Sequence, residues 1–163
     1  MSDFGDVALR AKVRVAGGDR NALALRFGVL LPQTSFGNGL GPNTLRTFAQ
    51  VLATKAIGRA SLHVNAGLAL LDEPLRAHEQ RDMLAYGVAL TVPVGWMTLA
   101  GEVAGLAGSG SPGADERSEA RLGARIGRGR VRGDVAVRRG LTETVGEWGV
   151  TGGVTFTLRG PRT

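Results

Sequence analysis

Residues 7–15 read Val-Ala-Leu-Arg-Ala-Lys-Val-Arg-Val, and this alternation of aliphatic with mostly charged side chains decides the fold class. Successive side chains of a β-strand point to opposite faces. A strand here therefore has one aliphatic face and one face that carries Arg10, Lys12 and Arg14. We expect a β-strand with one apolar side and one charged side.

The same period of two recurs along the chain. One segment is ambiguous, because residues 45–57 also fit an amphipathic helix that begins after Asn43 or Thr44. We favour a strand there, since segments with the strand spacing flank it, although residues 114–126 and the stretch after Pro74 also have helix-like compositions. Together with 7–15 and 45–57, nine strand candidates result, the others being 23–31, 61–70, 83–94, 97–107, 121–126, 131–138 and 147–158.

The lengths of these segments and of their connections favour a membrane barrel. Most candidates have about ten residues, which suits the ~9–11 residues of a membrane-spanning strand better than the ~5–6 residues usual in soluble domains. Up-and-down membrane barrels have short periplasmic turns and longer extracellular loops. If residues 150–158 run towards the periplasm, every short connection lies on the periplasmic side. The connections alternate between short ones, at 17–21, 58–59, 95 and 128–129, and long ones, at 33–44, 72–82, 108–119 and 139–146.

Composition and charge argue against several other classes of protein. The chain of 163 residues has no cysteine, which excludes disulfides and thiolate metal sites. Its formal charge is +6, but the basic residues are spread along the chain without a dense run, so we expect no nucleic-acid partner. No apolar run reaches the ~18 residues of a transmembrane helix. The N-terminus also lacks the features of a signal peptide.

The fold class that these patterns predict is all-β. We expect one domain over residues 1–163 that forms an antiparallel, up-and-down transmembrane β-barrel. Known bacterial single-chain barrels have even numbers of strands, so nine strands predict an incomplete barrel. We expect either that N-terminal strands and a signal peptide lie outside this sequence, or that copies associate to complete the barrel.

The alternation allows two opposite arrangements of the faces, and side-chain size favours one of them. In a soluble lipocalin-like barrel the aliphatic face fills the interior, whereas in a membrane barrel it meets lipid. Only 5% of the residues are aromatic, which is few for a packed interior. We expect a polar lumen that either favours anions or is filled by arginines paired with Glu102, Asp134 and Glu147. The predicted lumen-lining residues are Arg10, Lys12, Arg14, Arg26, His63, Glu102, Arg121, Arg125, Arg132, Asp134 and Arg138.

The last strand candidate resembles the β-signal by which the outer-membrane assembly machinery recognises a barrel. Residues 151–158 read Thr-Gly-Gly-Val-Thr-Phe-Thr-Leu, with apolar side chains at alternate positions after the glycines. The usual signal ends the chain with an aromatic residue, whereas residues 159–163 follow here. We expect Gly153, Phe156 and Leu158 to act as an assembly signal, and an ordinary edge strand is the alternative.

No constellation of residues indicates catalysis, and we expect neither an enzyme nor a cofactor or metal site. Ser61 and His63 share one face of a strand, but no acidic residue is evident that would orient the histidine. We therefore interpret His63 as a polar lumen residue. The acidic residues within 72–82 fit solvated loop charge better than a cation site.

Three short motifs resemble a family of bacterial outer-membrane proteins labelled for the meta-pathway of phenol degradation. The first, Gly-Asp-Val-Ala-Leu-Arg-Ala-Lys at 5–12, is similar to a strand of that family. The second is Leu-Arg-Phe-Gly-Val-Leu-Leu-Pro at 25–32, and the third is Thr-Lys-Ala-Ile-Gly at 54–58, which leads into the strand at 60–71. The resemblance covers most of this chain and the C-terminal part of a family member. It implies an outer-membrane barrel that passes small, aromatic or hydrophobic compounds.

The leading functional hypothesis is a passive channel or transporter for small molecules in the bacterial outer membrane. Its expected partners are the lipid bilayer, the barrel-assembly machinery and a small solute. Two alternatives stay open. One is a non-conducting structural or adhesion barrel whose loops bind partners, and the other is a soluble lipocalin-like β-barrel carrier.

Overall fold

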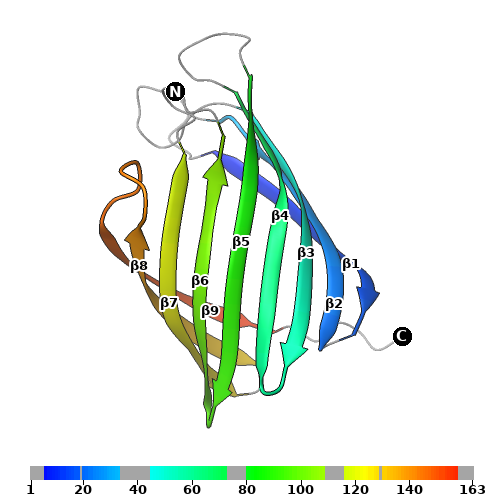
Figure 1. The fold of residues 1–163 in the computed structure, drawn as a ribbon, viewed down its shortest axis with the longest axis vertical. Coiled ribbons are helices and arrows are strands. Elements are labelled where there is room, and N and C mark those ends of the chain that lie inside the picture. The colour runs from blue at the N-terminus through cyan, green and yellow to red at the C-terminus, as the bar shows by residue number, and fades with distance from the viewer. Residues whose placement is uncertain are drawn as a thin grey trace.

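The computed structural model describes residues 6–18, 20–33, 45–72, 80–108, 116–128 and 130–157, and these residues form nine strands and no helix. Each strand pairs antiparallel with the next, so the order in the single sheet is the order in the chain (Figure 1). No helix that could cross a membrane occurs among the described residues. The strands are β1 (Val7–Gly17), β2 (Asn21–Leu31), β3 (Arg46–Ile57), β4 (Ala60–Asp72), β5 (Gln80–Val94), β6 (Met97–Ala107), β7 (Arg117–Arg128), β8 (Val131–Gly140) and β9 (Trp148–Phe156).

The all-β, antiparallel part of the predicted fold is confirmed, including its ambiguous segment. Residues 46–57 form β3, which pairs along its length with β2 on one side and β4 on the other. Residues 117–128, whose composition also suits a helix, form β7 between β6 and β8. In both segments two neighbouring strands satisfy the backbone groups that a helix would satisfy internally, so sheet pairing overrides the local preference.

Short and long connections alternate as the sequence predicts. Gly58 and Arg59 alone join β3 to β4, and Gly95 and Trp96 join β5 to β6. Gly58 has a φ of +60° and Gly95 a φ of +57°, a left-handed conformation that tight hairpin turns use and that glycine adopts without steric cost. These hairpins lie at the lower end of the sheet in Figure 1. The longer connections, 32–45, 73–79, 108–116 and 141–147, join strands at the opposite end.

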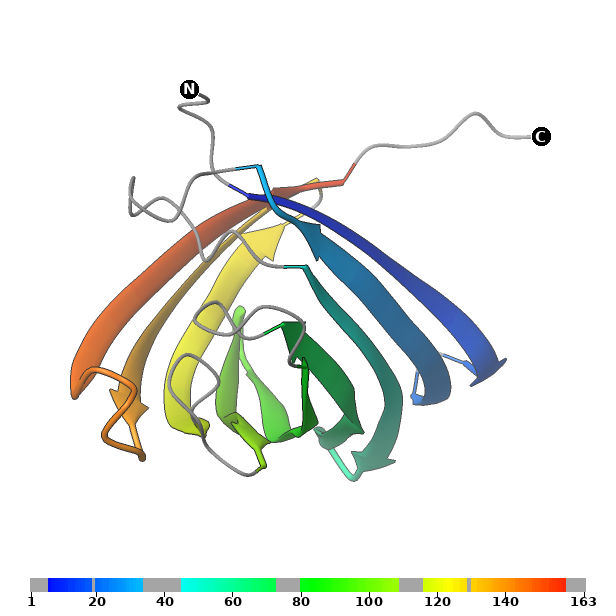
Figure 2. The same cartoon turned by 90° about the horizontal axis from the view of Figure 1, so that it is seen from above.

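The sheet curves into a trough, and its two edge strands are not paired with each other (Figure 2). The described residues therefore form an open sheet, and the larger barrel to which the sequence predicts that it belongs stays a prediction. Because neighbouring strands are antiparallel, β1 and β9 run in the same direction, and joining them directly would need a parallel pair. The outer backbone N–H and C=O groups of these edge strands are open to a further strand.

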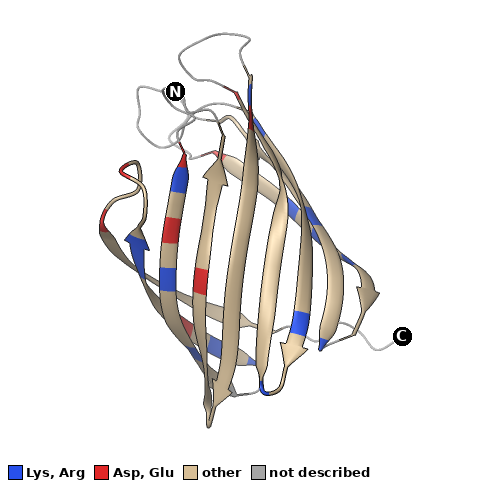
Figure 3. Ribbon diagram, in the orientation of Figure 1, with Lys and Arg blue, Asp and Glu red and all other residues tan. Residues whose placement is uncertain are grey.

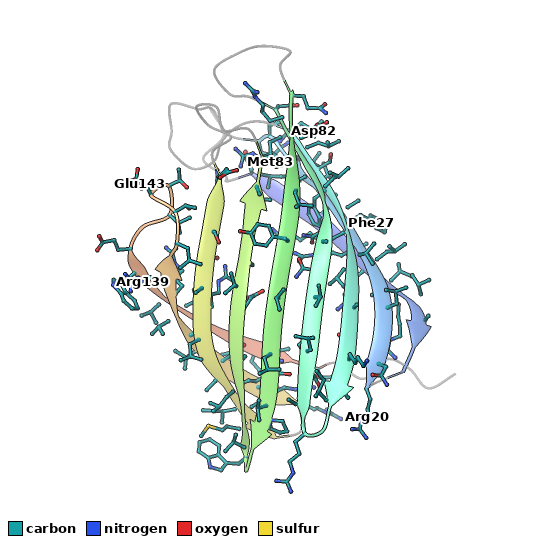
Figure 4. All side chains as sticks on the ribbon, in the orientation of Figure 1. Arg20, Phe27, Asp82, Met83, Arg139 and Glu143 are labelled. Carbon is teal, nitrogen blue, oxygen red and sulfur yellow. The ribbon has the colours of Figure 1, made fainter. Side chains whose placement is uncertain are left out.

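The register assigns each strand side chain to the convex or the concave face of the trough. Phe27 projects from the convex side of the sheet in Figure 4. Its row of partners runs through Ala49 and Leu68 to Leu84, so these side chains share the convex face. Side chains one position along each strand, such as Met83, lie on the concave face.

The two faces are packed very differently. On the concave face, Ala69, Leu71, Met83 and Ala85 form a small buried cluster, in which Met83 is only 1% exposed. On the convex face, large apolar side chains have nothing covering them. This distribution is the reverse of that in water-soluble proteins, which rarely expose large contiguous apolar patches. Every strand contributes to the exposed set, with examples in chain order being Leu9, Phe27, Val51, Leu68, Val88, Val103, Leu122, Val135 and Val150.

Two aromatic side chains lie across glycines of neighbouring strands. On the convex face, the Tyr86 hydroxyl donates a hydrogen bond of 3.1 Å to Ser118 Oγ, and Gly105 on β6 stands between them. A Cβ atom added at Gly105 would lie 2.7 Å from the Tyr86 hydroxyl. On the concave face, a Cβ atom added at Gly28 would lie 2.8 Å from the Phe48 ring. Each ring therefore occupies the space that the missing side chain of a glycine leaves open.

Candidate functional site

The concave face gathers most of the charged side chains of the sheet, and Figure 3 marks their positions along the strands. The register places every residue that the sequence predicts to line a lumen on this face. Whether the face borders a water-filled passage stays a prediction. In chain order these residues are Arg10, Lys12, Arg14 and Arg26 on β1 and β2, His63 on β4, Glu102 on β6, Arg121 and Arg125 on β7, and Arg132, Asp134 and Arg138 on β8.

On β6, β7 and β8, acidic and basic side chains neutralise one another in an ion-pair cluster of Glu102, Glu119, Arg121 and Arg138. Glu119 is at its centre, because its Oε1 contacts Arg121 Nη2 and its Oε2 lies 3.4 Å from Arg138 Nη1. Arg121 Nη1 also lies 3.7 Å from Glu102 Oε2. Arg138 extends over Gly149 of β9, where a Cβ atom would lie 2.5 Å from its Nε. The cluster therefore joins three strands and touches a fourth.

Sequence reasoning misses the central residue of this cluster. From the sequence, Glu119 is expected in the long connection 108–119, whereas β7 already begins at Arg117. Glu119 lies on the strand two residues before Arg121 and so shares its face. That spacing of two is the signal that identifies Glu119, but the helix-like composition of residues 114–126 obscures where the strand begins.

The predicted ladder of ion pairs is shorter in the structure than in the sequence analysis. Arg125 and Asp134 are register partners, but neither they nor Arg132 form an ion pair among the described residues. Glu147 does not belong to the ladder, because it precedes β9 and its side chain is exposed. The part of the ladder that forms involves Glu102.

On β1 and β2, by contrast, three basic side chains have no ion-pair partner among the described residues. Arg10, Lys12 and Arg26 form what we call the basic wall. Lys12 and Arg26 are register partners, and two like charges directly opposite each other destabilise a sheet. None of the three forms an ion pair within the described part of the chain. Arg26 instead stacks on Phe48, with its guanidinium carbon 5.2 Å from the ring centroid.

A cavity of about 290 Å³ opens beside the basic wall. Arg10, Arg26 and Arg46 line it from three successive strands. Arg46 and Phe48 are not among the residues that the sequence predicts to line a lumen, although their spacing of two places them on one face of β3. The apolar residues that line the cavity, which we call the floor, are Phe48, Ala69, Leu71, Ala85 and Leu106.

The environment of His63 is neutral and polar. Its Nδ1 lies 3.0 Å from Thr54 Oγ1, and its Nε2 lies 3.0 Å from Thr91 Oγ1. Both ring nitrogens are therefore occupied by threonine hydroxyls from the strands on either side. Within the described part of the chain, no group of three or more His, Asp or Glu side chains is arranged to hold a metal ion. Most of the acidic stretch 72–82, residues 73–79, lies outside the described residues.

The proposed assembly signal lies on the last strand. Gly153 pairs with Asp134 on the concave face, and Phe156 is 68% exposed on the convex face. Leu158 lies outside the described residues. Since β9 is an edge strand, one side of its backbone is open to another strand.

The fold and the site together define a curved antiparallel sheet with an apolar convex face and a charged concave face. Comparison of the chain with family models, with curated proteins and with solved structures gave no match. The resemblance to the outer-membrane proteins of the meta-pathway therefore stays a prediction.

Proposed function

We propose that the protein is a bacterial outer-membrane β-barrel that acts as a passive channel for small molecules. In this arrangement the convex face meets the acyl chains, and the concave face borders an aqueous passage. The observation that carries the proposal is the set of exposed apolar side chains on all nine strands. Removing apolar surface from water stabilises a protein by ~25 cal/mol per Å², so lipid would stabilise this sheet where water does not.

The strand lengths support a membrane location. The shortest strand, β9, has 9 residues, and the longest, β5, has 15. A tilted strand needs ~9–11 residues to cross the hydrocarbon core. Each of the nine strands is therefore long enough to span it.

The open edges add a requirement to the proposal. In hydrocarbon, every backbone N–H and C=O group needs a partner, because no water is present to supply one. The edge strands β1 and β9 must then pair with further strands, either of the same protein or of a second copy. The assembly machinery is a proposed partner for β9, with Gly153 and Phe156 as part of the signal that it recognises.

The ion-pair cluster favours a second candidate function, a non-conducting barrel that binds partners through its loops. Its four side chains project from three strands into the space that a channel would leave open. The soluble carrier fits less well, since its aliphatic side chains would have to lie on the concave face.

Two measurements test these functions in sequence. The first is the dispersion of the purified protein in buffer with and without detergent, and we expect a monodisperse sample only with detergent. A monodisperse sample in plain buffer would overturn the membrane location. The second is the conductance of a planar lipid bilayer that contains the protein. We expect discrete current steps, whereas incorporation without steps would favour the non-conducting barrel.

A further inference from the structure

We infer that the cavity between the basic wall and the floor is a binding site for a small organic carboxylate that has an apolar body. This inference deepens the proposed function, because it takes the concave face to be the one that meets solutes. Three arginines, Arg10, Arg26 and Arg46, line the cavity together with the apolar residues of the floor.

The site has a net positive charge, because among the described residues the side chains of the basic wall lack the carboxylate partners that the arginines of the ion-pair cluster have. The arginines of the ion-pair cluster already have carboxylate partners in Glu102 and Glu119. The basic wall has none among the described residues, although Lys12 and Arg26 face each other across β1 and β2. An anion bound there would offset the repulsion between like charges. A carboxylate suits this position, because its two oxygens accept paired hydrogen bonds from a guanidinium group.

The Phe48 ring restrains Arg26 before any ligand arrives. Its guanidinium group lies over the Phe48 ring, at 5.2 Å from the centroid, and both residues line the cavity. Stacking on a ring holds the guanidinium plane and leaves its edge N–H groups able to donate. The stacked arginine therefore loses little freedom when it binds an anion.

The floor selects an apolar body. Phe48 and Leu106 pack against the buried cluster but are themselves only partly buried, so they leave apolar surface open to the cavity. A small hydrated anion would contact the guanidinium groups and leave this surface uncovered. An alkyl or ring substituent would cover it, which is favourable in proportion to the area removed from water. The cavity volume, about 290 Å³, lies at the lower end of the ~300–1,000 Å³ range of ligand pockets, so the ligand is small.

The test uses three related probes and isothermal titration calorimetry of the protein in detergent micelles. Cyclohexanecarboxylate has both the charge and the apolar body, acetate has the charge alone, and cyclohexylmethanol has the body alone. We expect saturable binding of cyclohexanecarboxylate, with an affinity at least about tenfold higher than for either of the others. Equal affinities for the three probes, or no saturable binding of cyclohexanecarboxylate, would overturn the inference.

A matched pair of variants locates the binding. Arg26 and Arg139 each stack on an aromatic ring at 5.2 Å, but Arg139 lies over Trp148 on the convex face. We expect Arg26→Gln to weaken binding of cyclohexanecarboxylate about tenfold or more, because hydrogen bonds to charged groups contribute this much. Arg139→Gln should leave the affinity unchanged. Equal effects of the two substitutions would show that the cavity is not the site.

A third variant tests the floor, and circular dichroism confirms that each variant keeps its sheet. Leu106→Thr should weaken cyclohexanecarboxylate binding and leave acetate binding unaffected. If the variant weakens the binding of cyclohexanecarboxylate and of acetate equally, the floor does not contact the apolar body.

The binding site and the channel can fail independently, because binding in micelles requires no conduction. A protein that conducts ions but does not bind cyclohexanecarboxylate overturns only the binding site. A protein that binds without conducting overturns only the channel.

Discussion

Glu102 on β6 and Arg121 on β7 are register partners on the concave face, and Glu102 Oε2 lies 3.7 Å from Arg121 Nη1. Arg121 also contacts Glu119, which lies 3.4 Å from Arg138 on β8. Glu119 is the most enclosed acid of the cluster, with 19% of its side chain exposed. The cluster thus depends on one carboxylate that two arginines share.

Replacing that carboxylate should weaken the sheet. Glu119→Gln keeps the shape of the side chain but removes the charge that Arg121 and Arg138 share. We expect the free energy of unfolding to fall by about 1 kcal/mol, since solvent screens these partly exposed arginines. Urea unfolding in detergent, followed by tryptophan fluorescence, measures this change. Glu143→Gln, in the exposed connection before β9, is the control, and an equal loss there would show that the cluster contributes nothing specific.

Two glycines on the convex face of β6 should respond in opposite ways to alanine. At Gly105 a Cβ atom would clash with the Arg117 carbonyl oxygen and lie 2.7 Å from the Tyr86 hydroxyl, so Gly105→Ala must shift both the backbone of β7 and the ring that contacts Ser118. At Gly101 a Cβ atom would meet only Leu122, at 3.9 Å. We expect Gly105→Ala to cost about 1–3 kcal/mol of unfolding free energy. Gly101→Ala should leave it unchanged or raise it by about 0.5 kcal/mol. Similar losses at both positions would show that the close contacts at Gly105 have no specific effect.

The arginines of β7 and β8 without ion pairs should influence ion selectivity if the concave face borders a channel. Arg125→Glu and Arg132→Glu each reverse one charge outside the ion-pair cluster. We expect the reversal potential in a salt gradient to shift towards cation preference, because basic side chains in a pore favour anions. Arg139→Glu, which changes the same charge on the convex face, should cause no shift. If neither concave variant differs from the unaltered protein, these arginines do not face the permeating ions.

The alternating side chains allowed the fold class to be predicted, but they could not show which charged side chains meet. Val7, Leu9 and Val13 alternate with basic residues so regularly that only a strand separates them into two faces. The ambiguity of the segment 45–57 had a physical cause, because its apolar residues satisfy both periods. Pairing with β2 and β4 decides between them, and that pairing is not a local property of the sequence.

The sequence predicted which face of the sheet each side chain of the candidate site lies on, but not which side chains it contacts. Arg26 could be assigned to the polar face from its spacing, but its stacking on Phe48 depends on the register between β2 and β3. The register also decides that Glu102 meets Arg121, whereas Glu147 precedes β9 and has no register partner. The odd number of strands already predicted an incomplete barrel, and in the structure β1 and β9 are both unpaired edges.

The measurement that tests the central claim most directly is the environment of the two faces in lipid vesicles. The chain has no cysteine, so single cysteines can carry spin labels whose collisions with oxygen, which dissolves in lipid, and with a water-soluble nickel complex are compared. Val88 and Val103 are exposed on the convex face, and Ala89 and Ala104 are their concave neighbours. We expect labels at 88 and 103 to collide mainly with oxygen, and labels at 89 and 104 to be more accessible to the nickel complex. The reverse pattern, or water access at all four positions, would contradict the account.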